Sequence, residues 1–193
     1  MKESDIRPRG LFEEYLRLSA EDVEQYFAKQ VNRVQRSCPA CSTDAPQSAF
    51  QKNGFDLVRC GECETLYVTP GPEASALAAF YTDSPSQKYW ANVFFPSVAE
   101  ARREMIFAPR AAKIATLLEH FGIEARRVAD VGAGTGLMLA QLRNYLTDTE
   151  FLAVEPTQEM ADECRRQSFA VYQGFADEAA QRVEFAGTVD LAM

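Results

Sequence analysis

The chain's 193 residues are enough for one full domain or two small ones, and its composition is that of an ordinary globular protein. Its net charge of -8 leaves no broad basic face, so we expect neither nucleic acid nor an anionic membrane as a partner. Because no apolar run reaches membrane-spanning length and the N-terminus lacks the apolar segment of a signal peptide, we expect a cytoplasmic protein.

The first regular apolar spacing runs from Leu11 to Arg36 and predicts one helix or two. Ser19 and Asp22 have the spacing of a capping pair, which would start a second helix inside this stretch. No residue here indicates chemistry. We therefore interpret residues 1–36 as a helical segment for packing or dimerisation.

Two Cys-x-x-Cys pairs follow, and a predicted hairpin separates them. Asn53-Gly54 lies between two stretches of strand-forming residues and is a strong signal for a hairpin turn, while 65–68 predicts a third strand. This is the layout of a zinc ribbon, in which four thiolates surround one tetrahedral ion and leave no open position for catalysis. We predict a zinc-ribbon-like module over residues 37–70, with Zn²⁺ held by Cys38, Cys41, Cys60 and Cys63.

Two other interpretations of these cysteines stay open, a redox-active Cys-x-x-Cys pair and buried cysteines without a ligand. A redox site needs only one pair, so the presence of two favours zinc. Zinc ribbons often bind nucleic acid, but this one has more acidic than basic side chains. Asp56, Glu62 and Glu64 stand against Lys52 and Arg59, so nucleic-acid binding is disfavoured.

Residues 71–121 are expected to form a helical connection and cap. A helix is predicted from Glu73 to Tyr81, followed by an aromatic-rich loop punctuated by Pro and Ser. Its aromatic side chains either pack against the domain or line a substrate pocket, and packing is the simpler explanation. A second helix is predicted from Val98 to Phe121, with a kink at Pro109 and with His120 near its C-terminus as a capping residue.

From Val128 onward, predicted strands and helices alternate along the chain. The strands are 128–131, 151–154, 169–172 and 188–192. Such alternation predicts a parallel sheet with right-handed crossovers, whose ligands bind at the carboxyl ends of the strands. The first strand leads into a glycine-dense turn that ends at Gly136 and opens a helix, which is a loop that lets a ligand approach the backbone closely.

The glycine spacing distinguishes two classes of ligand. A dinucleotide fingerprint places glycines at the first, third and sixth positions, but with Gly132 as the first position the sixth is Leu137. The glycines instead fall at Gly132, Gly134 and Gly136, with Asp130 two residues before the first. This Asp-x-Gly-x-Gly-x-Gly pattern resembles the first motif of class I S-adenosylmethionine-dependent methyltransferases. A nicotinamide-dependent oxidoreductase is therefore disfavoured.

Glu155 stands at the end of the second predicted strand, about twenty residues after the glycine loop, where a carboxylate can accept hydrogen bonds from ribose hydroxyls. The resemblance implies that the glycine loop faces the methionine moiety, that Glu155 binds the ribose, and that the loop after the third strand lies beside the adenine. For the adenine, Phe175 would stack or Asp177 would bond the exocyclic amine. The implied cofactor residues are Asp130, Gly132, Ala133, Gly134, Gly136, Glu155, Phe175, Ala176 and Asp177.

Together, the four-cysteine module and the glycine loop resemble methyltransferases related in layout to sugar C-methyltransferases. The resemblance implies S-adenosyl-L-methionine and Zn²⁺ as cofactors and a small-molecule methyl acceptor such as an activated sugar; a homo-oligomer is compatible with it. Such domains carry a seven-stranded sheet, whereas residues 122–193 would supply only its N-terminal half, with the last strand at an edge of the order three-two-one-four.

The expected fold class is therefore α/β, a Rossmann-like parallel sheet truncated after the fourth strand and preceded by a small zinc-ribbon module and helices. We expect a fragment or truncated product; the alternative is that another chain completes the sheet. No catalytic base can be named. The leading hypothesis is a methyltransferase, and the alternative is a non-catalytic protein whose zinc ribbon and helices form an interaction module.

Overall fold

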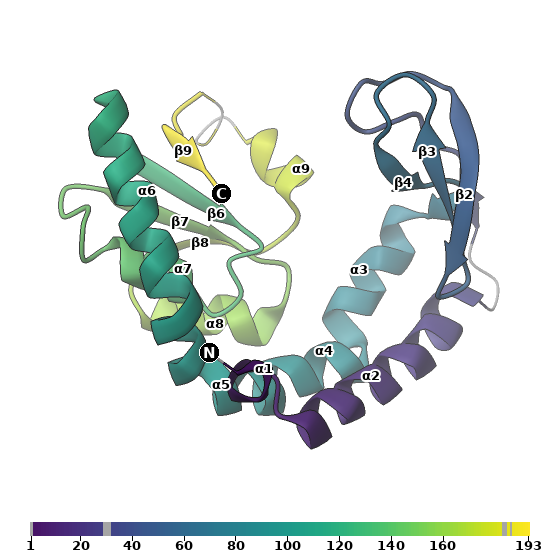
Figure 1. The fold of residues 1–193 in the computed structure, drawn as a ribbon, viewed down its shortest axis with the longest axis horizontal. Helices are drawn as coiled ribbons and strands as arrows, with labels where there is room; N and C mark the ends of the chain where they lie inside the picture. Colours follow the sequence, from purple (N-terminus) through teal and green to yellow (C-terminus); the bar gives the residue numbers. More distant parts are fainter. Residues whose placement is uncertain (1, 29–31, 183–184, 186) are drawn as a thin grey trace. The chain divides into compact units, whose positions relative to one another are not determined.

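The computed structural model describes residues 2–28, 32–182, 185 and 187–193. The chain divides into two compact units (Figure 1). One is Glu14–Ser86, and the other combines the residues up to Glu13 with Gln87–Met193. The four segments predicted from the sequence stay a prediction. Among the described residues, no helix combines the length and the apolar character needed to cross a membrane.

Helix α2 (Arg9–Val23) passes through Ser19 without a break and continues into the π-helical turn η1 (Glu24–Ala28). The predicted start of a second helix at Ser19 is therefore wrong. Asp22 is buried, and it accepts a hydrogen bond of 2.8 Å from the backbone N–H of Ser86 in α4 (Pro85–Tyr89). The carboxylate thus satisfies an amide at the start of another helix, which sequence spacing alone could not reveal.

The predicted helix through Arg36 is also too long, because β1 (Arg33–Val34) is extended and pairs antiparallel with β5 (Gly71–Pro72). Residues 29–31 lie outside the described residues. The ribbon forms a separate antiparallel sheet in the order β2-β3-β4. Its strands are β2 (Pro46–Lys52), β3 (Phe55–Cys60) and β4 (Leu66–Val68).

The predicted hairpin turn is confirmed. Asn53 and Gly54 have φ angles of 53° and 74° between β2 and β3. Positive φ at both central residues is what a type I′ turn requires, and Asn and Gly tolerate it best. Directly after the turn, the ring of Phe55 packs against Phe27 with centroids 5.5 Å apart. Phe27 in turn contacts Phe80 of α3 (Ala74–Asp83), with ring centroids 5.3 Å apart, so the turn end of the hairpin is anchored to the helices of its own unit.

In the second unit, strand order and direction agree with the predicted α/β class (Figure 1). The strands are parallel in the order β8-β7-β6-β9, that is, three-two-one-four along the chain. They are β6 (Arg127–Val131), β7 (Glu150–Val154), β8 (Ala170–Tyr172) and β9 (Leu191–Ala192). The helices α7 (Leu137–Leu142), α8 (Gln158–Arg166) and α9 (Ala176–Ala180) alternate with them. Val128, Leu139 and Leu142 form the fully buried centre of this unit's core.

The residues before the sheet are helical almost throughout. They form α1 (Glu3–Ile6), η2 (Trp90–Phe94), α5 (Phe95–Arg102), η3 (Arg103–Phe107) and α6 (Ala108–Phe121). The predicted aromatic loop is therefore wrong. Phe94 is fully buried and Trp90 stacks on it with ring centroids 4.6 Å apart, so burial of the aromatic rings favours helix over loop. Pro109 lies in the first turn of α6, where its missing N–H costs no helical hydrogen bond.

Candidate metal centre and candidate cofactor site

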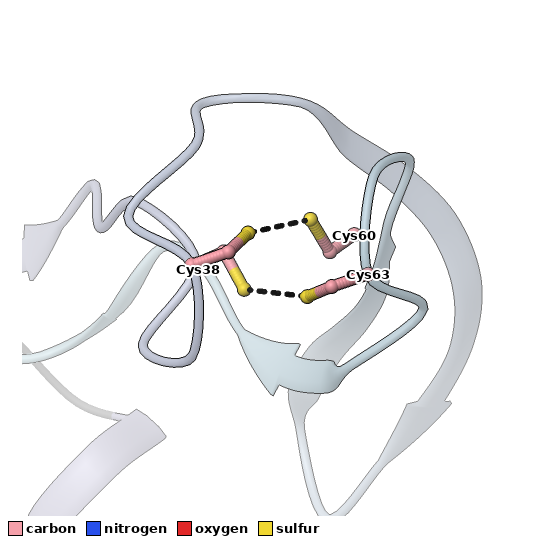
Figure 2. A group of neighbouring side chains, drawn as sticks. Cys38, Cys60 and Cys63 are labelled. Carbon is pink, nitrogen blue, oxygen red and sulfur yellow. Dashed lines mark hydrogen bonds between the residues drawn. The ribbon is translucent and has the colours of Figure 1, made fainter.

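The four cysteines of the ribbon converge on one point (Figure 2). Their sulfur atoms all lie within 4.8 Å of one another. Across the two turns, Cys38 and Cys63 are 3.5 Å apart and Cys41 and Cys60 are 3.6 Å apart, measured between Sγ atoms. A tetrahedral zinc ion with bonds of about 2.3 Å holds its sulfurs about 3.8 Å apart. The four thiols therefore have the donor chemistry and the spacing that Zn²⁺ requires.

The two cysteine turns have the same backbone geometry. The N–H of Cys38 donates to the carbonyl of Thr43 at 3.0 Å, and the N–H of Cys60 donates to that of Thr65 at 2.9 Å. The residue after each second cysteine is left-handed, with φ of 60° at Ser42 and 62° at Glu64. Each half of the site is therefore one copy of the same Cys-x-x-Cys-x-Thr turn, which aims two sulfurs at a common centre.

Each turn also places a threonine hydroxyl beside its second, exposed cysteine. Thr43 Oγ1 lies 3.4 Å from Cys41 Sγ, and Thr65 Oγ1 lies 3.2 Å from Cys63 Sγ. Hydrogen bonding from the Thr65 side chain, and then from its backbone, lowers the pKa of Cys63 to about 6. Thr43 lowers the pKa of Cys41 in the same way. Both hydroxyls therefore favour thiolate, the form that binds metal. The prediction of the zinc site overlooked these threonines, although the repeated Cys-x-x-Cys-x-Thr spacing is visible in the sequence.

In the second unit, the glycine loop joins β6 to α7 through three left-handed residues. Gly132, Gly134 and Gly136 have φ angles of 74°, 56° and 76°. The N–H groups of Gly132 and Ala133 donate to the carbonyl of Val154, the last residue of β7, at 2.8 and 3.2 Å. A Cβ at Gly132 would meet nothing within 4 Å. The loop is thus fixed to the neighbouring strand on one side and open at Gly132, where a ligand can approach the backbone.

Glu155, the residue directly after β7, is bound to this loop. It is 5% exposed; its Oε2 accepts from the N–H of Gly134 at 2.8 Å and its Oε1 accepts from the N–H of Thr157 at 2.9 Å. The structure therefore brings two of the predicted cofactor residues together. An ionised carboxylate offers about four acceptor positions, so about two remain for hydroxyl groups of a ligand. Glu155 also holds the glycine loop in place, a role that the sequence analysis did not predict.

Two side chains near the C-terminal end of α8 hold the other side of the loop. Cys164 Sγ donates to the carbonyl of Gly134 at 3.2 Å, and Gln167 Nε2 donates to that of Thr135 at 2.6 Å. Burial raises the pKa of Cys164 to about 12, so its sulfur stays a protonated donor. A Cβ at Gly136 would lie 3.1 Å from Cys164 Sγ and from the ring of Phe169. In the sequence, Cys164 resembles any small apolar residue of a helix, and no local pattern marks Gln167.

Asp130, the fourth residue of β6, is half-buried, yet its carboxyl has no polar partner among the described residues. Its carboxyl has no hydrogen bond or ion pair to any residue that the structure describes. Burial, and then the negative charge of Glu155, raises the pKa of Asp130 to about 6. A half-buried carboxylate without a counter-charge fits a ligand that carries positive charge, as the sulfonium and amine of S-adenosylmethionine do.

The predicted adenine contacts lie at the start of α9, one residue beyond a backbone contact with Glu155. The N–H of Gly174 donates to the carbonyl of Glu155 at 3.3 Å. The next residue, Phe175, is half-buried and precedes α9, whereas Ala176 and Asp177 are exposed in its first turn. Their roles toward a cofactor stay a prediction.

A cavity of about 620 Å³ lies beside the glycine loop. Its walls include Phe95 of α5, Arg103 of η3, Thr135 of the loop, and Met160 of α8. The hydroxyl oxygen of Thr135 is buried without a hydrogen-bond partner among the described residues. The cavity therefore combines apolar and charged walls with an unsatisfied polar group next to the loop.

No protein-family model matches the chain, and no curated protein is significantly similar to it. Among solved structures, DesVI of Streptomyces venezuelae is 25% identical, covering 41% of this chain and 34% of its own, with a TM-score of 0.35. The sugar N-methyltransferase KedS8 of Streptoalloteichus is 26% identical, covering 41% and 32%, with a TM-score of 0.35. The plantazolicin methyltransferase BpumL, solved in complex with SAH, is 14% identical, covering 60% and 44%, with a TM-score of 0.44.

This chain therefore matches less than half the length of each of those proteins. All three TM-scores lie below 0.5, and the α/β fold described above rests on the strand order and direction of this chain's own sheet.

Proposed function

We propose that the chain binds S-adenosyl-L-methionine at the glycine loop and transfers its methyl group to a small molecule. One observation carries the proposal: a buried carboxylate, Glu155, directly follows one parallel strand and accepts a hydrogen bond of 2.8 Å from the N–H of a left-handed glycine, Gly134, after the neighbouring strand. This places acidic acceptors and bare backbone at the carboxyl ends of adjacent strands, where α/β folds bind nucleoside-containing ligands.

Each residue of the site has a proposed task. Gly132 leaves its backbone open to the methionine part, and Asp130 supplies the negative charge that a cationic ligand needs. Glu155 uses its remaining acceptor positions for the ribose hydroxyls, and Phe175 or Asp177 lies against the adenine. The bound cofactor supplies a methyl group already activated by its sulfonium, so the protein's main tasks are to align the acceptor and to exclude water.

A sugar as methyl acceptor is suggested only by the resemblance of the sequence motifs. The cavity that reaches Thr135 gives a small molecule room beside the loop. Its walls carry Arg103, Glu159 and Glu163 as well as apolar side chains, so a polar acceptor with several hydrogen-bonding groups fits it better than a lipid.

The zinc proposal accompanies this one. The sulfurs of Cys38, Cys41, Cys60 and Cys63 would form a closed site, so the ion's task is to hold the ribbon together. The small buried core around it, with Val58 and Tyr67 beside two of the cysteines, is too small to order three strands alone. Free thiols of this kind persist in a reducing compartment, and a cytoplasmic location is part of the proposal.

Isothermal titration with S-adenosylhomocysteine tests the cofactor proposal. The wild-type chain is expected to bind one equivalent, and Glu155→Ala should lower the affinity at least 10-fold because the loop and the ribose both lose their acceptor. Glu119→Ala, which removes an exposed carboxylate from α6, is the matched control and should bind as the wild type does. A folded wild-type chain that binds no S-adenosylhomocysteine would contradict the proposal.

The second candidate is a non-catalytic interaction protein built on the ribbon. The observation that favours it is that the ribbon belongs to a different compact unit from the glycine loop and that all residues of β2 are exposed at the edge of its sheet. Native mass spectrometry separates the two candidates: one zinc and one S-adenosylhomocysteine per chain support the methyltransferase, and zinc alone supports the interaction module.

A further inference from the structure

A half-buried arginine in the second unit lacks a counter-charge. Arg102, the last residue of α5, forms no ion pair with any residue that the structure describes, and its Nε is buried without a hydrogen-bond partner. The guanidinium carbon lies 5.6 Å from the ring centre of Phe95 and 6.0 Å from that of Phe107. The two rings hold the planar group in place, but they do not satisfy its N–H groups.

Two further arginines act on Arg102. Burial, and then the positive charges of Arg7 and Arg110, lower the pKa of Arg102. Arg7 is placed by Phe12, whose ring lies 5.3 Å from the guanidinium carbon. Phe12 in turn packs at 5.9 Å against Phe94, the residue before α5. Arg7, which directly follows α1, and Arg110 of α6 therefore lie close enough to Arg102 of α5 for their charges to repel it.

Local acidic groups do not balance this cluster. Within the described part of the chain, Arg7 pairs only with the exposed Glu3, at 3.4 Å, and Arg110 makes no ion pair. A chain with a net charge of -8 has ample carboxylates to pair three arginines. Burying an unpaired polar group is costly, and an orphaned buried donor calls for an explanation such as a bound ion. Three neighbouring positive charges and a buried N–H without an acceptor together indicate a negatively charged ligand.

We propose that Arg7, Arg102 and Arg110 bind a phosphate group. The planar fork of a guanidinium matches two oxygens of a phosphate, and a doubly charged oxyanion offers acceptors to several such forks at once. The aromatic rings that hold Arg7 and Arg102 fix these forks before the anion arrives, which lowers the entropic cost of binding.

The arginine cluster lies near the cavity beside the glycine loop. Phe95, against which Arg102 packs, also lines the cavity that contains Thr135 of the glycine loop. The phosphate is either free inorganic phosphate or part of a phosphorylated small molecule that extends toward this cavity. Phosphate binding itself does not require methyl transfer, so it stands independently of the proposed function.

Thermal unfolding and isothermal titration of the full chain with inorganic phosphate test the proposal, with chloride at matched ionic strength as the reference. Phosphate is expected to raise the melting temperature in a saturable way, whereas chloride does not. Arg102→Met keeps an unbranched side chain over the two rings but removes the charge, and it should weaken phosphate binding at least 10-fold. Without phosphate, this variant should melt at the same or a higher temperature, because it removes an unpaired buried charge. A merely structural arginine would give the opposite result.

Arg110→Gln provides a second variant at an exposed position, so loss of folding cannot explain its effect. It should weaken phosphate binding severalfold. Arg126→Gln, which removes an exposed arginine paired with Glu124, is the matched control and should leave phosphate affinity unchanged. Equal stabilisation by chloride, or phosphate binding unaffected by both Arg102→Met and Arg110→Gln, would overturn the proposal.

The same titration with uridine diphosphate identifies the source of the phosphate. Tighter binding of uridine diphosphate than of inorganic phosphate, lost in Arg102→Met, would assign the site to a phosphorylated small molecule. Equal affinities would assign it to the free anion. Affinity for S-adenosylhomocysteine should stay unchanged in Arg102→Met, so failure of this proposal and failure of the cofactor proposal are separately visible.

Discussion

The candidate site of the ribbon is made of side chains, whereas that of the glycine loop is made of backbone. The ribbon gathers four side chains from two copies of one short turn, and each cysteine contributes its own donor atom. The glycine loop contributes backbone and empty space, while side chains distant in the sequence, Glu155, Cys164 and Gln167, hold it in position. We expect the first kind of site to depend on a bound zinc ion for its stability, and the second to depend on the packing of its unit. Metal removal and substitutions in the loop should therefore affect the two sites separately.

Zinc removal should give the largest effect and should affect only the ribbon. Without the ion, four sulfurs within 4.8 Å of one another would lose what holds them together, and the small core around Val58 and Tyr67 cannot order the sheet alone. We expect a strong chelator to unfold this module while the parallel sheet stays folded. Backbone amide NMR signals report the two units separately. A ribbon whose signals ignore chelation would contradict the prediction.

The fifth cysteine provides the control for that experiment. Cys60→Ser removes one donor from the cluster and should abolish stable zinc binding, measured by native mass spectrometry. Cys164→Ser changes a buried cysteine of the other unit and should leave the zinc content at one per chain. It should instead weaken S-adenosylhomocysteine binding severalfold, because Cys164 holds the carbonyl of Gly134. Equal zinc loss in both variants would point to general unfolding.

Within the glycine loop, two glycine substitutions should differ in what they damage. Both positions are left-handed, so alanine costs about 1–2 kcal/mol of backbone strain at each. At Gly136 the added Cβ would also lie 3.1 Å from Cys164 Sγ and Phe169, whereas at Gly132 it would meet nothing within 4 Å. Gly136→Ala should therefore lower the melting temperature of this unit clearly more than Gly132→Ala. Gly132→Ala should fold and lose cofactor affinity, measured by titration. Similar melting temperatures would contradict this distinction.

Asp130→Asn should change stability and binding in opposite directions. Burial and Glu155 raise the pKa of Asp130 from 3.8 to about 6, so the folded chain holds this proton more tightly than the unfolded chain. The resulting stability is present below pH 3.8 and is lost as the pH rises through about 6. At pH 8 the asparagine variant should gain about 1–3 kcal/mol in the free energy of unfolding, and at pH 3.5 it should gain little.

Binding of S-adenosylmethionine gives the second half of that test. In the wild type, affinity should rise as the pH passes through about 6, because ionised Asp130 then faces the cationic ligand. In Asp130→Asn the affinity should be about 10-fold lower at pH 8 and nearly independent of pH. An asparagine variant that is less stable than the wild type at pH 8, or that keeps the pH-dependent affinity, would contradict this role of Asp130.

The sequence predicted the elements whose information is local. The Asn53-Gly54 turn, the convergence of the cysteine pairs and the parallel direction of the strands depend on short-range geometry and on alternation, and all three are present in the structure. The prediction failed where a residue's role depends on a partner that is distant in the sequence. Asp22 has the spacing of a cap for its own helix, yet it caps α4, sixty-four residues further along the chain.

The contacts that hold the glycine loop were hidden for the same reason. Gln167 bonds to Thr135 across 32 positions of the sequence, and no local pattern distinguishes this glutamine from a solvated one. Glu155 was singled out by its position after a strand, but its bond to Gly134 depends on how two strands sit side by side. Sequence patterns locate ligand-facing groups, whereas the residues that position them depend on tertiary packing.

The smallest expected effect tests whether the two cysteine turns are equivalent. Thr65→Val removes the hydroxyl 3.2 Å from Cys63 Sγ without changing side-chain size, and zinc should still bind. The zinc ion should transfer from this variant to a chromogenic chelator about 10-fold faster than from the wild type, because the hydroxyl that supports the Cys63 sulfur has been lost. Thr65→Ser keeps the hydroxyl and should restore the wild-type rate. If the turns are equivalent, Thr43→Val will give the same acceleration, because Thr43 stands 3.4 Å from Cys41 Sγ in the same geometry. Equal rates for valine and serine at position 65 would show that the hydroxyl does not support the sulfur, and the repeated Cys-x-x-Cys-x-Thr spacing would then reflect only the backbone turn.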